Sequence, residues 1–156
     1  MQTINIFTDG SCDNKPNRRE GANWCVILND KFELLHEIGT IELHSSNTRQ
    51  EMFAIKNALL LLATNKINYR EAIVYSDSEF MVNSFNKGWL QSWLDQNILH
   101  LKKNEDIWEQ ILPLLNFKIK FKHIRGHQKE NGSEEVKWNN YCDRRCGEMR
   151  KLMLNN

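Results

Sequence analysis

Strong net charge is missing from this sequence of 156 residues, because 21 Lys and Arg residues stand against 20 Asp and Glu residues and leave a formal net charge of +1. No global field draws the protein to nucleic acid, so any such partner has to be recognised through local patches. With only 2 prolines and 7 glycines, the chain also lacks a low-complexity linker. Its composition, 40% apolar and 26% charged, is globular, and its length suits a single domain over residues 1–156.

Long hydrophobic runs are missing as well. The longest one, Ala58 to Ala63, is far shorter than a bilayer span, and the N-terminus lacks the basic and apolar pattern of a signal peptide. The 4 cysteines form no Cys-x-x-Cys pair and have no zinc-ligand spacing. Cys142 and Cys146 are one helical turn apart, which favours core packing over ligation. These absences predict a reduced cytoplasmic protein with no membrane association.

A short apolar strand over residues 2–9 opens the chain and ends in Asp9, followed by the turn residue Gly10. In open α/β sheets, ligands bind at the carboxyl ends of strands, so an acid at this point is a candidate functional residue. Taken alone, Asp9-Gly10 is explained better as a turn signal. The interpretation therefore depends on the other acids of the chain.

Two further strands are predicted over residues 21–30 and 33–43, with a hairpin turn between them. Together with the first strand they form an antiparallel meander. The polar turn that precedes them, residues 13–20, carries Lys15, Arg18 and Arg19.

The hydrophobic period becomes helical over residues 47–64, where Met52, Ile55 and Leu59 share one face. Glu51 lies at the N-terminal end of this apolar face, where an acid is unusual. One explanation is a capping box formed by Thr48 and Glu51, which also suits the helix macrodipole. The other is a functional site, and the helix alone favours the cap.

A fourth strand over residues 71–76 ends in another acid, Asp77, followed by Ser78 and a helical pattern. Because a helix separates this strand from the third, we expect it to run parallel to the first strand through a right-handed crossover. Either Asp77 or Ser78 is explained equally as a helix cap. If the two strands are neighbours, Asp9 and Asp77 lie side by side.

The C-terminal third begins with helical segments that end at Pro113, followed by a predicted half-exposed strand over residues 117–124. The strand alternates Phe117, Ile119 and Phe121 with Lys118, Lys120 and Lys122. His127 follows in a glycine loop. A final helix is expected over residues 139–153, with Asp143 near its start, as a functional acid or as a surface acid balanced by neighbouring arginines.

Five motifs, taken in order, resemble the type 1 ribonuclease H family. They are Thr8-Asp9-Gly10-Ser11-Cys12, Asn47-Thr48-Arg49-Gln50-Glu51-Met52, Ser76-Asp77-Ser78, Gly126-His127 and Asn139-x-x-Cys142-Asp143. The resemblance covers essentially the whole chain. It implies an α/β ribonuclease H-like fold, in which a five-stranded mixed sheet of order 3-2-1-4-5 has strands 1–3 antiparallel and strands 1, 4 and 5 parallel, flanked by helices.

The resemblance also implies that Asp9, Glu51, Asp77 and Asp143 form a catalytic acidic cluster. Crowded carboxylates raise one another's pKa values unless cations neutralise them, and oxygen ligands suit Mg²⁺ or Mn²⁺ rather than zinc. Two such ions activate a water and stabilise the leaving oxygen in a phosphodiester displacement. We expect Asp9 to bridge the two Mg²⁺ ions, Glu51 and Asp77 to complete one metal site, and Asp143 to ligate the other.

The implied reaction is hydrolysis of the RNA strand of an RNA/DNA hybrid, which leaves a 5′-phosphate and a 3′-hydroxyl. By resemblance, His127 assists proton transfer or product departure, for which histidine is suited near neutral pH. A surface loop histidine is the alternative for this residue.

RNA is distinguished from DNA by its 2′-hydroxyls in a wide, shallow minor groove. The candidate readers are the backbone of Cys12 and the side chain of Asn47. Ser46 is a candidate for holding a DNA phosphate. Trp89 is a candidate for packing on a deoxyribose, with a core tryptophan as an equal alternative.

Several departures from the family pattern affect substrate binding. Thr48 stands where the family often has asparagine, and Glu79 where it often has glutamine. The interval from His127 to Asp143 is longer than in common bacterial members. Residues 94–106 are nearly charge-balanced, where many members carry a strongly basic protrusion, so we expect weaker hybrid binding with a shallow salt dependence.

Two other functions remain open at this stage. One is a hybrid-binding or RNA-binding module of the same fold with an impaired site, although all four acids are present. The other is the nuclease domain of a larger machine. The position of Met1 just before the first strand, and of the C-terminus just past the last helix, favours a standalone enzyme with no extra hybrid-binding domain. We also expect a monomer without an obligate protein partner.

Overall fold

The structure, a computed structural model, describes residues 1–154; Asn155 and Asn156, which the single-domain prediction includes, lie outside the described residues. The strands are β1 (Gln2–Cys12), β2 (Gly21–Leu28), β3 (Leu34–Glu42), β4 (Tyr69–Ser76) and β5 (Ile119–His123). The helices are α1 (Asn47–Thr64), α2 (Glu79–Asn86), α3 (Trp89–Asp95), α4 (Glu105–Ile111) and α5 (Glu134–Leu154), with short 3-10 turns η1 (Leu99–Leu101) and η2 (Leu112–Leu114).

The five strands form one mixed sheet of order β3-β2-β1-β4-β5. β1, β2 and β3 pair antiparallel, whereas β1, β4 and β5 pair parallel. The predicted strand order and strand directions are confirmed. The crossover through α1 is the connection that a parallel pair requires.

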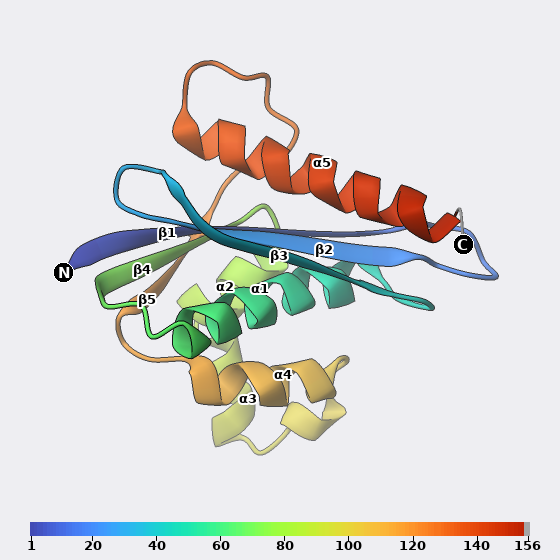
Figure 1. Cartoon of the computed structure of the whole chain (residues 1–156). Coiled ribbons are helices and arrows are strands. Elements are labelled where there is room, and N and C mark those ends of the chain that lie inside the picture. Colours follow the sequence, from blue (N-terminus) through green and yellow to red (C-terminus); the bar gives the residue numbers. More distant parts are fainter. Residues whose placement is uncertain (155–156) are drawn as a thin grey trace.

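Helices cover both faces of the sheet (Figure 1). On one face, α1 packs its predicted apolar stripe against β1 and β2, and Ile4, Ile6 and Met52 are completely buried there. On the other face, α5 lies across β1 and β2, and Phe7, Val26 and Cys142 form a second buried cluster. α3 and α4 lie beyond α1, away from the sheet (Figure 1). β1 is thus the central strand, with buried side chains on both of its faces.

β1 is longer than predicted, and this changes the setting of Asp9. The strand continues to Cys12 because its antiparallel ladder with β2 runs on to the Cys12–Gly21 pair. The parallel ladder with β4 stops earlier, at the Phe7–Tyr75 pair. On the β2 edge of β1, Asp9 is therefore still paired within the ladder. On the β4 edge, it lies where the two strands separate.

Other predicted boundaries also shift. α5 begins at Glu134 rather than near residue 139, so Asp143 lies in the middle of this helix and much of the long interval after His127 is helical. β5 begins at Ile119, and Phe117 lies outside it with 82% of its surface exposed. The strand predicted over 117–124 from the alternation of apolar and basic residues is too long, because the exposed Phe117 side chain is not packed into the sheet. Among the described residues, no helix has the length and apolar content needed to cross a bilayer.

Candidate active site

Three carboxylates from separate elements converge where β1 and β4 separate. Asp9 projects from β1, Asp77 directly follows β4, and Glu51 lies in the first turns of α1. One oxygen from each lies within 4.8 Å of the others. Asp9 and Glu51 are only 3% and 8% exposed, so the cluster is recessed into the protein. The predicted neighbourhood of Asp9 and Asp77 is observed, and Glu51 joins them from the helix.

A close approach between β1 and α1 brings Glu51 to Asp9. A Cβ atom at Gly10 would overlap the backbone carbonyl carbon of Gln50 and the backbone nitrogen of Glu51, so only glycine fits there. The Gly10 N–H donates to Asp9 Oδ1 at 2.9 Å and fixes that carboxylate. The Asp-Gly pair, which alone resembles an ordinary turn, is therefore the contact between strand and helix.

The capping interpretation of Glu51 is wrong. The N-cap of α1 is Ser46, whose hydroxyl accepts from the Arg49 N–H at 3.1 Å, so Thr48 and Glu51 form no capping box. Instead, Glu51 is buried, and its Oε2 has no hydrogen-bond partner in the described part of the chain. A buried carboxylate oxygen without a donor is costly, and a bound cation would relieve that cost.

The three acids share an unfavourable electrostatic environment. Burial, reinforced by the charge of Asp77, raises the pKa of Asp9 well above its usual range. Burial and then the charge of Asp9 do the same to the pKa of Glu51. Burial and then Asp143 raise the pKa of Asp77. Without a cation, this cluster retains protons that free carboxylic acids would lose.

These raised pKa values predict how the stability of the metal-free protein depends on pH. Above the ordinary carboxylate pKa of about 4, the folded cluster binds more protons than the unfolded chain, so its contribution to the free energy of unfolding falls as pH rises. We expect the melting temperature in EDTA to fall with pH more steeply for the wild type than for Asp9→Asn between pH 5 and 8. Added Mg²⁺ or Mn²⁺ should raise the wild-type melting temperature more at pH 8 than at pH 5. Parallel pH profiles for the two proteins would contradict the electrostatic account.

Asp143 and His127 lie at the outer side of the cluster. Asp143 is outside the tight group of three, and its side chain is 44% exposed, yet it is close enough to raise the pKa of both Asp9 and Asp77. His127 is 81% exposed, and its Nδ1 lies 3.7 Å from Asp143 Oδ2. Gly126 packs so closely on the Asp77 carboxylate that an added Cβ would lie 2.7 Å from Oδ2. The loop before α5 therefore contacts the cluster on its open side.

The predicted substrate-binding residues begin next to this cluster. The Cys12 N–H donates to Asn47 Oδ1 at 2.7 Å, which joins the two predicted RNA readers across 35 positions of sequence. This bond uses the backbone donor of Cys12 and orients the Asn47 amide, so the Nδ2 group of that amide is the end left for a ligand. Ser46 stands beside Asn47 as the α1 cap.

A groove of about 460 Å³ lies beside Ser46, and the sequence did not reveal most of it. Its walls include Phe80, Trp93 and Lys102, with Lys102 Nζ 4.9 Å from the centre of the Trp93 ring. Trp89 is 36% exposed and lies 6.2 Å from Phe80 between ring centres, so it is neither fully buried nor free. The spacing of aromatic residues over 80–93 was the one sequence pattern that could have indicated this groove, but the same spacing is equally typical of a buried core.

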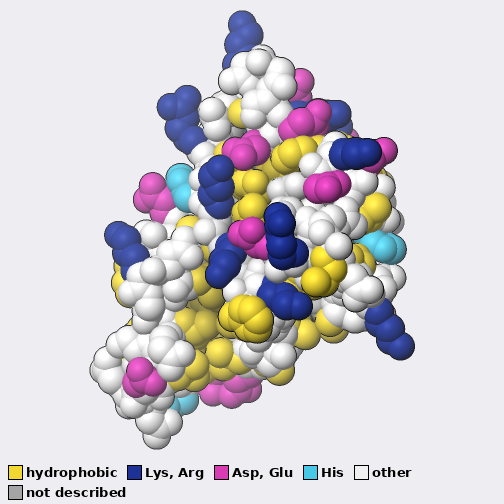
Figure 2. All heavy atoms as spheres, turned by 90° about the vertical axis from the view of Figure 1, so that its left-hand side faces the viewer, with side chains coloured by type: hydrophobic (Ala, Val, Ile, Leu, Met, Phe, Trp, Pro, Cys, Tyr) yellow, Lys and Arg dark blue, Asp and Glu magenta, His cyan; other side chains and the backbone are white. Residues whose placement is uncertain are grey.

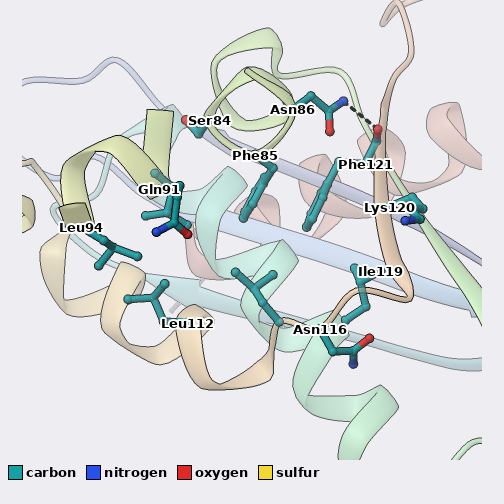
Figure 3. A pocket seen from close by; sticks show the side chains of 12 residues that line it. Ser84, Phe85, Asn86, Gln91, Leu94, Leu112, Asn116, Ile119, Lys120 and Phe121 are labelled. Atoms are coloured by element: carbon teal, nitrogen blue, oxygen red, sulfur yellow. Dashed lines mark hydrogen bonds between the residues drawn. The ribbon is translucent and has the colours of Figure 1, made fainter. Parts of the chain in front are cut away.

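Another cavity, of about 420 Å³, lies elsewhere and contains none of the acids. Side chains of α2, α3, η2 and β5 line it, and Asn86 Nδ2 donates to the Phe121 carbonyl at 2.9 Å at its rim (Figure 3). On the face at the left of Figure 1, basic and acidic side chains are interspersed (Figure 2). This mixture agrees with the near-zero net charge and with recognition through local patches.

A mixed sheet of this order, with acids gathered where two of its parallel strands separate, defines an α/β protein with a candidate site for a divalent cation. The RNase H family model matches residues 1–150. The chain is 31% identical to a ribonuclease H of Syntrophomonas wolfei, over 92% of each chain, and 32% identical to one of Chlorobaculum parvum, over 91% of each. It belongs to the RNase H family of divalent-metal-dependent endoribonucleases.

Solved structures show the same fold at lower identity. The solution structure of the PFV RNase H domain matches with a TM-score of 0.78 at 22% identity, over 96% of this chain and 94% of that one. LC11-RNase H1 in complex with RNA/DNA hybrid matches with a TM-score of 0.69 at 22% identity, over 97% and 99%.

Proposed function

We propose that this protein is an endonuclease that hydrolyses the RNA strand of RNA/DNA hybrids with the help of two Mg²⁺ ions, leaving 5′-phosphate and 3′-hydroxyl ends. The observation that carries the proposal is the convergence of Asp9, Glu51 and Asp77, with a buried Glu51 oxygen that lacks a donor. Family membership and the hybrid bound to LC11-RNase H1 support the choice of substrate.

The donor set fits a hard divalent cation. The clustered ligands are carboxylate oxygens, without a cysteine or histidine among them, which suits Mg²⁺ or Mn²⁺. Asp9, Glu51, Asp77 and Asp143 would hold the ions. When bound, the ions supply an activated water and stabilise the leaving oxygen. Glu51 and Asp9 are held rigidly by the contact at Gly10, so little reorganisation is needed on binding.

The remaining residues bind substrate or move protons in this proposal. His127, in an exposed loop beside Asp143, assists proton transfer or product departure. Asn47, oriented by Cys12, donates from Nδ2 to a ribose 2′-hydroxyl. Ser46 and the adjacent groove receive the DNA strand, with Trp89 packing on a deoxyribose. We further propose that the chain acts as a single-domain monomer in the cytoplasm.

Strand-labelled cleavage of matched RNA/DNA, RNA/RNA and DNA/DNA duplexes, with Mg²⁺, Mn²⁺ or EDTA, tests the function. We expect only the RNA strand of the hybrid to be cut, and only with a divalent ion. Product ends are identified by their reaction with a phosphatase and a kinase. If the wild type binds hybrid but cuts no duplex with either ion, the protein is instead a binding module of this fold.

A further inference from the structure

The turn between β1 and β2, residues 13–20, is fixed in place beside the predicted RNA readers. It closes through the Asp13 N–H, which donates to the Glu20 carbonyl at 2.9 Å, directly after the Cys12–Gly21 pair that ends the β1–β2 ladder. The Ser45 N–H donates to the Arg19 carbonyl at 3.1 Å and ties the turn to the start of α1. Arg19 is held at φ +40°, a left-handed conformation that non-glycine residues seldom adopt. This ordered turn therefore presents an exposed arginine at a defined place.

The C-terminal end of α5 packs against the same turn (Figure 1). Arg18 donates from Nη2 to the Met153 carbonyl at 3.1 Å, and its Nε lies 2.9 Å from Glu20 Oε1, a carboxylate that is 1% exposed. Arg18 and the buried Glu20 thus form a structural tie between helix and turn. Arg19, the residue after Arg18, takes part in neither of these two contacts.

Contacts between α5 and β1 repeat along both elements and point to Arg150. The Cys142 thiol donates to the Phe7 carbonyl at 3.6 Å, and one helical turn later the Cys146 thiol donates to the Asp9 carbonyl at 3.4 Å. The next step of this register pairs Arg150 with Ser11, because four helical residues and two strand residues advance by similar distances. Arg150 Nε and Ser11 Oγ are both buried and have no hydrogen-bond partner within residues 1–154.

Nearby acids are already paired with other cations. Glu20 is bound by Arg18, Asp13 lies 3.9 Å from Lys15, and Glu42 lies 2.8 Å from Arg49. Arg19 and Arg150 form no ion pair within residues 1–154. Both are near Cys12: burial raises the pKa of its thiol, and the two arginines act in the opposite direction. Asp13 and Glu42 also act on this thiol, but both already pair with other cations, so Arg19 and Arg150 are the cations near Cys12 that form no ion pair within the described residues.

We propose that Arg19 and Arg150 form a binding position for one backbone phosphate of the RNA strand, next to Cys12. This inference rests on the proposed function, because it takes Cys12 and Asn47 as the RNA readers. Guanidinium groups bind phosphate oxygens through paired, charge-assisted hydrogen bonds; Arg19 is exposed and Arg150 is half-buried, with its Nε inside the protein. The position adds phosphate contacts in a protein whose residues 94–106 are nearly charge-balanced.

The test measures hybrid affinity as a function of salt in the Asp9→Asn background, where bound substrate stays intact. We expect Arg19→Gln and Arg150→Gln together to weaken hybrid binding roughly five- to twentyfold at low salt, the effect of losing a charge-assisted contact. The slope of log affinity against log salt should fall by about 1, as for one lost phosphate contact. Lys151→Gln, which removes an exposed charge one position away, is the matched control and should change neither quantity by as much.

A second measurement locates the phosphate. Uncharged methylphosphonate linkages are placed one at a time in either strand, with a 2′-deoxy nucleotide on the 5′ side of each RNA linkage to prevent self-cleavage. A methylphosphonate at one RNA position should weaken hybrid binding by the Asp9→Asn protein, which keeps both arginines, but not by the double arginine variant. No methylphosphonate in the DNA strand should have this selective effect. A DNA position, or equal effects of all positions on both proteins, would overturn the assignment.

Folding and function are controlled separately. If Arg150→Gln lowers the melting temperature, Arg150→Lys keeps the charge and the aliphatic stem, and Arg19→Gln alone still reports on the exposed partner. Double variants that bind hybrid as tightly as the Asp9→Asn protein, with the same salt slope, would refute the phosphate position while hybrid cleavage by the wild type stands. A wild type that never cleaves hybrid would instead refute the proposed function.

Discussion

Asp9→Asn is expected to lower hybrid cleavage on the order of 10³-fold or more, because metal ions contribute several kcal/mol to such reactions and each ~1.4 kcal/mol is tenfold in rate. The substitution keeps the Oδ1 acceptor for the Gly10 N–H but removes the charge that faces Glu51 and Asp77. Single-turnover cleavage with Mg²⁺ measures the loss. Binding of hybrid, measured in parallel, should remain within a fewfold of the wild type.

The same substitution should stabilise the metal-free protein, since it removes one charge from a buried cluster of like charges. A gain of about 1 kcal/mol corresponds to a rise of roughly 2–4 °C in melting temperature for a chain of this size. Asp30→Asn, in the exposed turn between β2 and β3, is the control and should alter neither cleavage nor stability appreciably. An Asp9→Asn protein that cuts hybrid at the wild-type rate would remove Asp9 from the proposed metal site.

Among substitutions that add a single methyl group near the site, Gly10→Ala is expected to lower the free energy of unfolding the most. The new Cβ would overlap backbone atoms of Gln50 and Glu51, which cannot rotate away as a side chain can. Overpacking of this kind typically costs about 1–3 kcal/mol and more where backbone has to move. We expect a loss at the upper end of that range, together with reduced Mn²⁺ affinity, because separating β1 from α1 also separates Asp9 from Glu51.

Gly147→Ala in α5 is the matched control for that substitution. Nothing lies within 4 Å of a Cβ placed at Gly147, and the position is inside a helix. Alanine there should stabilise the protein by about 0.5–1 kcal/mol through its higher helix propensity. Urea unfolding of both variants, with isothermal titration of Mn²⁺, gives the comparison. Equal stability of the two alanine variants would show that the β1–α1 contact tolerates separation.

The sequence predicted the sheet and the elements that carry the acids, because each depended on a local pattern. The helical period over residues 47–64 matches α1 residue for residue, and the apolar runs ending in Asp9 and Ser76 marked the central parallel strands. Since β1 and β4 are neighbours, the proximity of Asp9 and Asp77 followed from topology alone. The strand order itself came from the family resemblance, and the residue-by-residue register was not predicted.

What the sequence left undetermined depends on contacts between distant segments. The burial of Glu51 could not be separated from a capping role, because both fit the same first helical turn and only the approach of Gly10 decides between them. The groove beside Ser46 joins α1 with residues 80–108, and its aromatics have the spacing of a core. The thiol contacts of Cys142 and Cys146 in α5 with β1 have no sequence signal of their own.

The fork between β1 and β4 holds Asp9 within one paired strand and Asp77 at the end of the other, whereas the segments around the cluster are a turn and a loop. Asp9 is built into a ladder that continues to Cys12, whereas the turn of residues 13–20 and the loop before α5 attach outside it. If the proposed function holds, insertions or new charges in those two segments change hybrid affinity, while Asp9 and Glu51 keep the positions that the β1–α1 contact at Gly10 gives them.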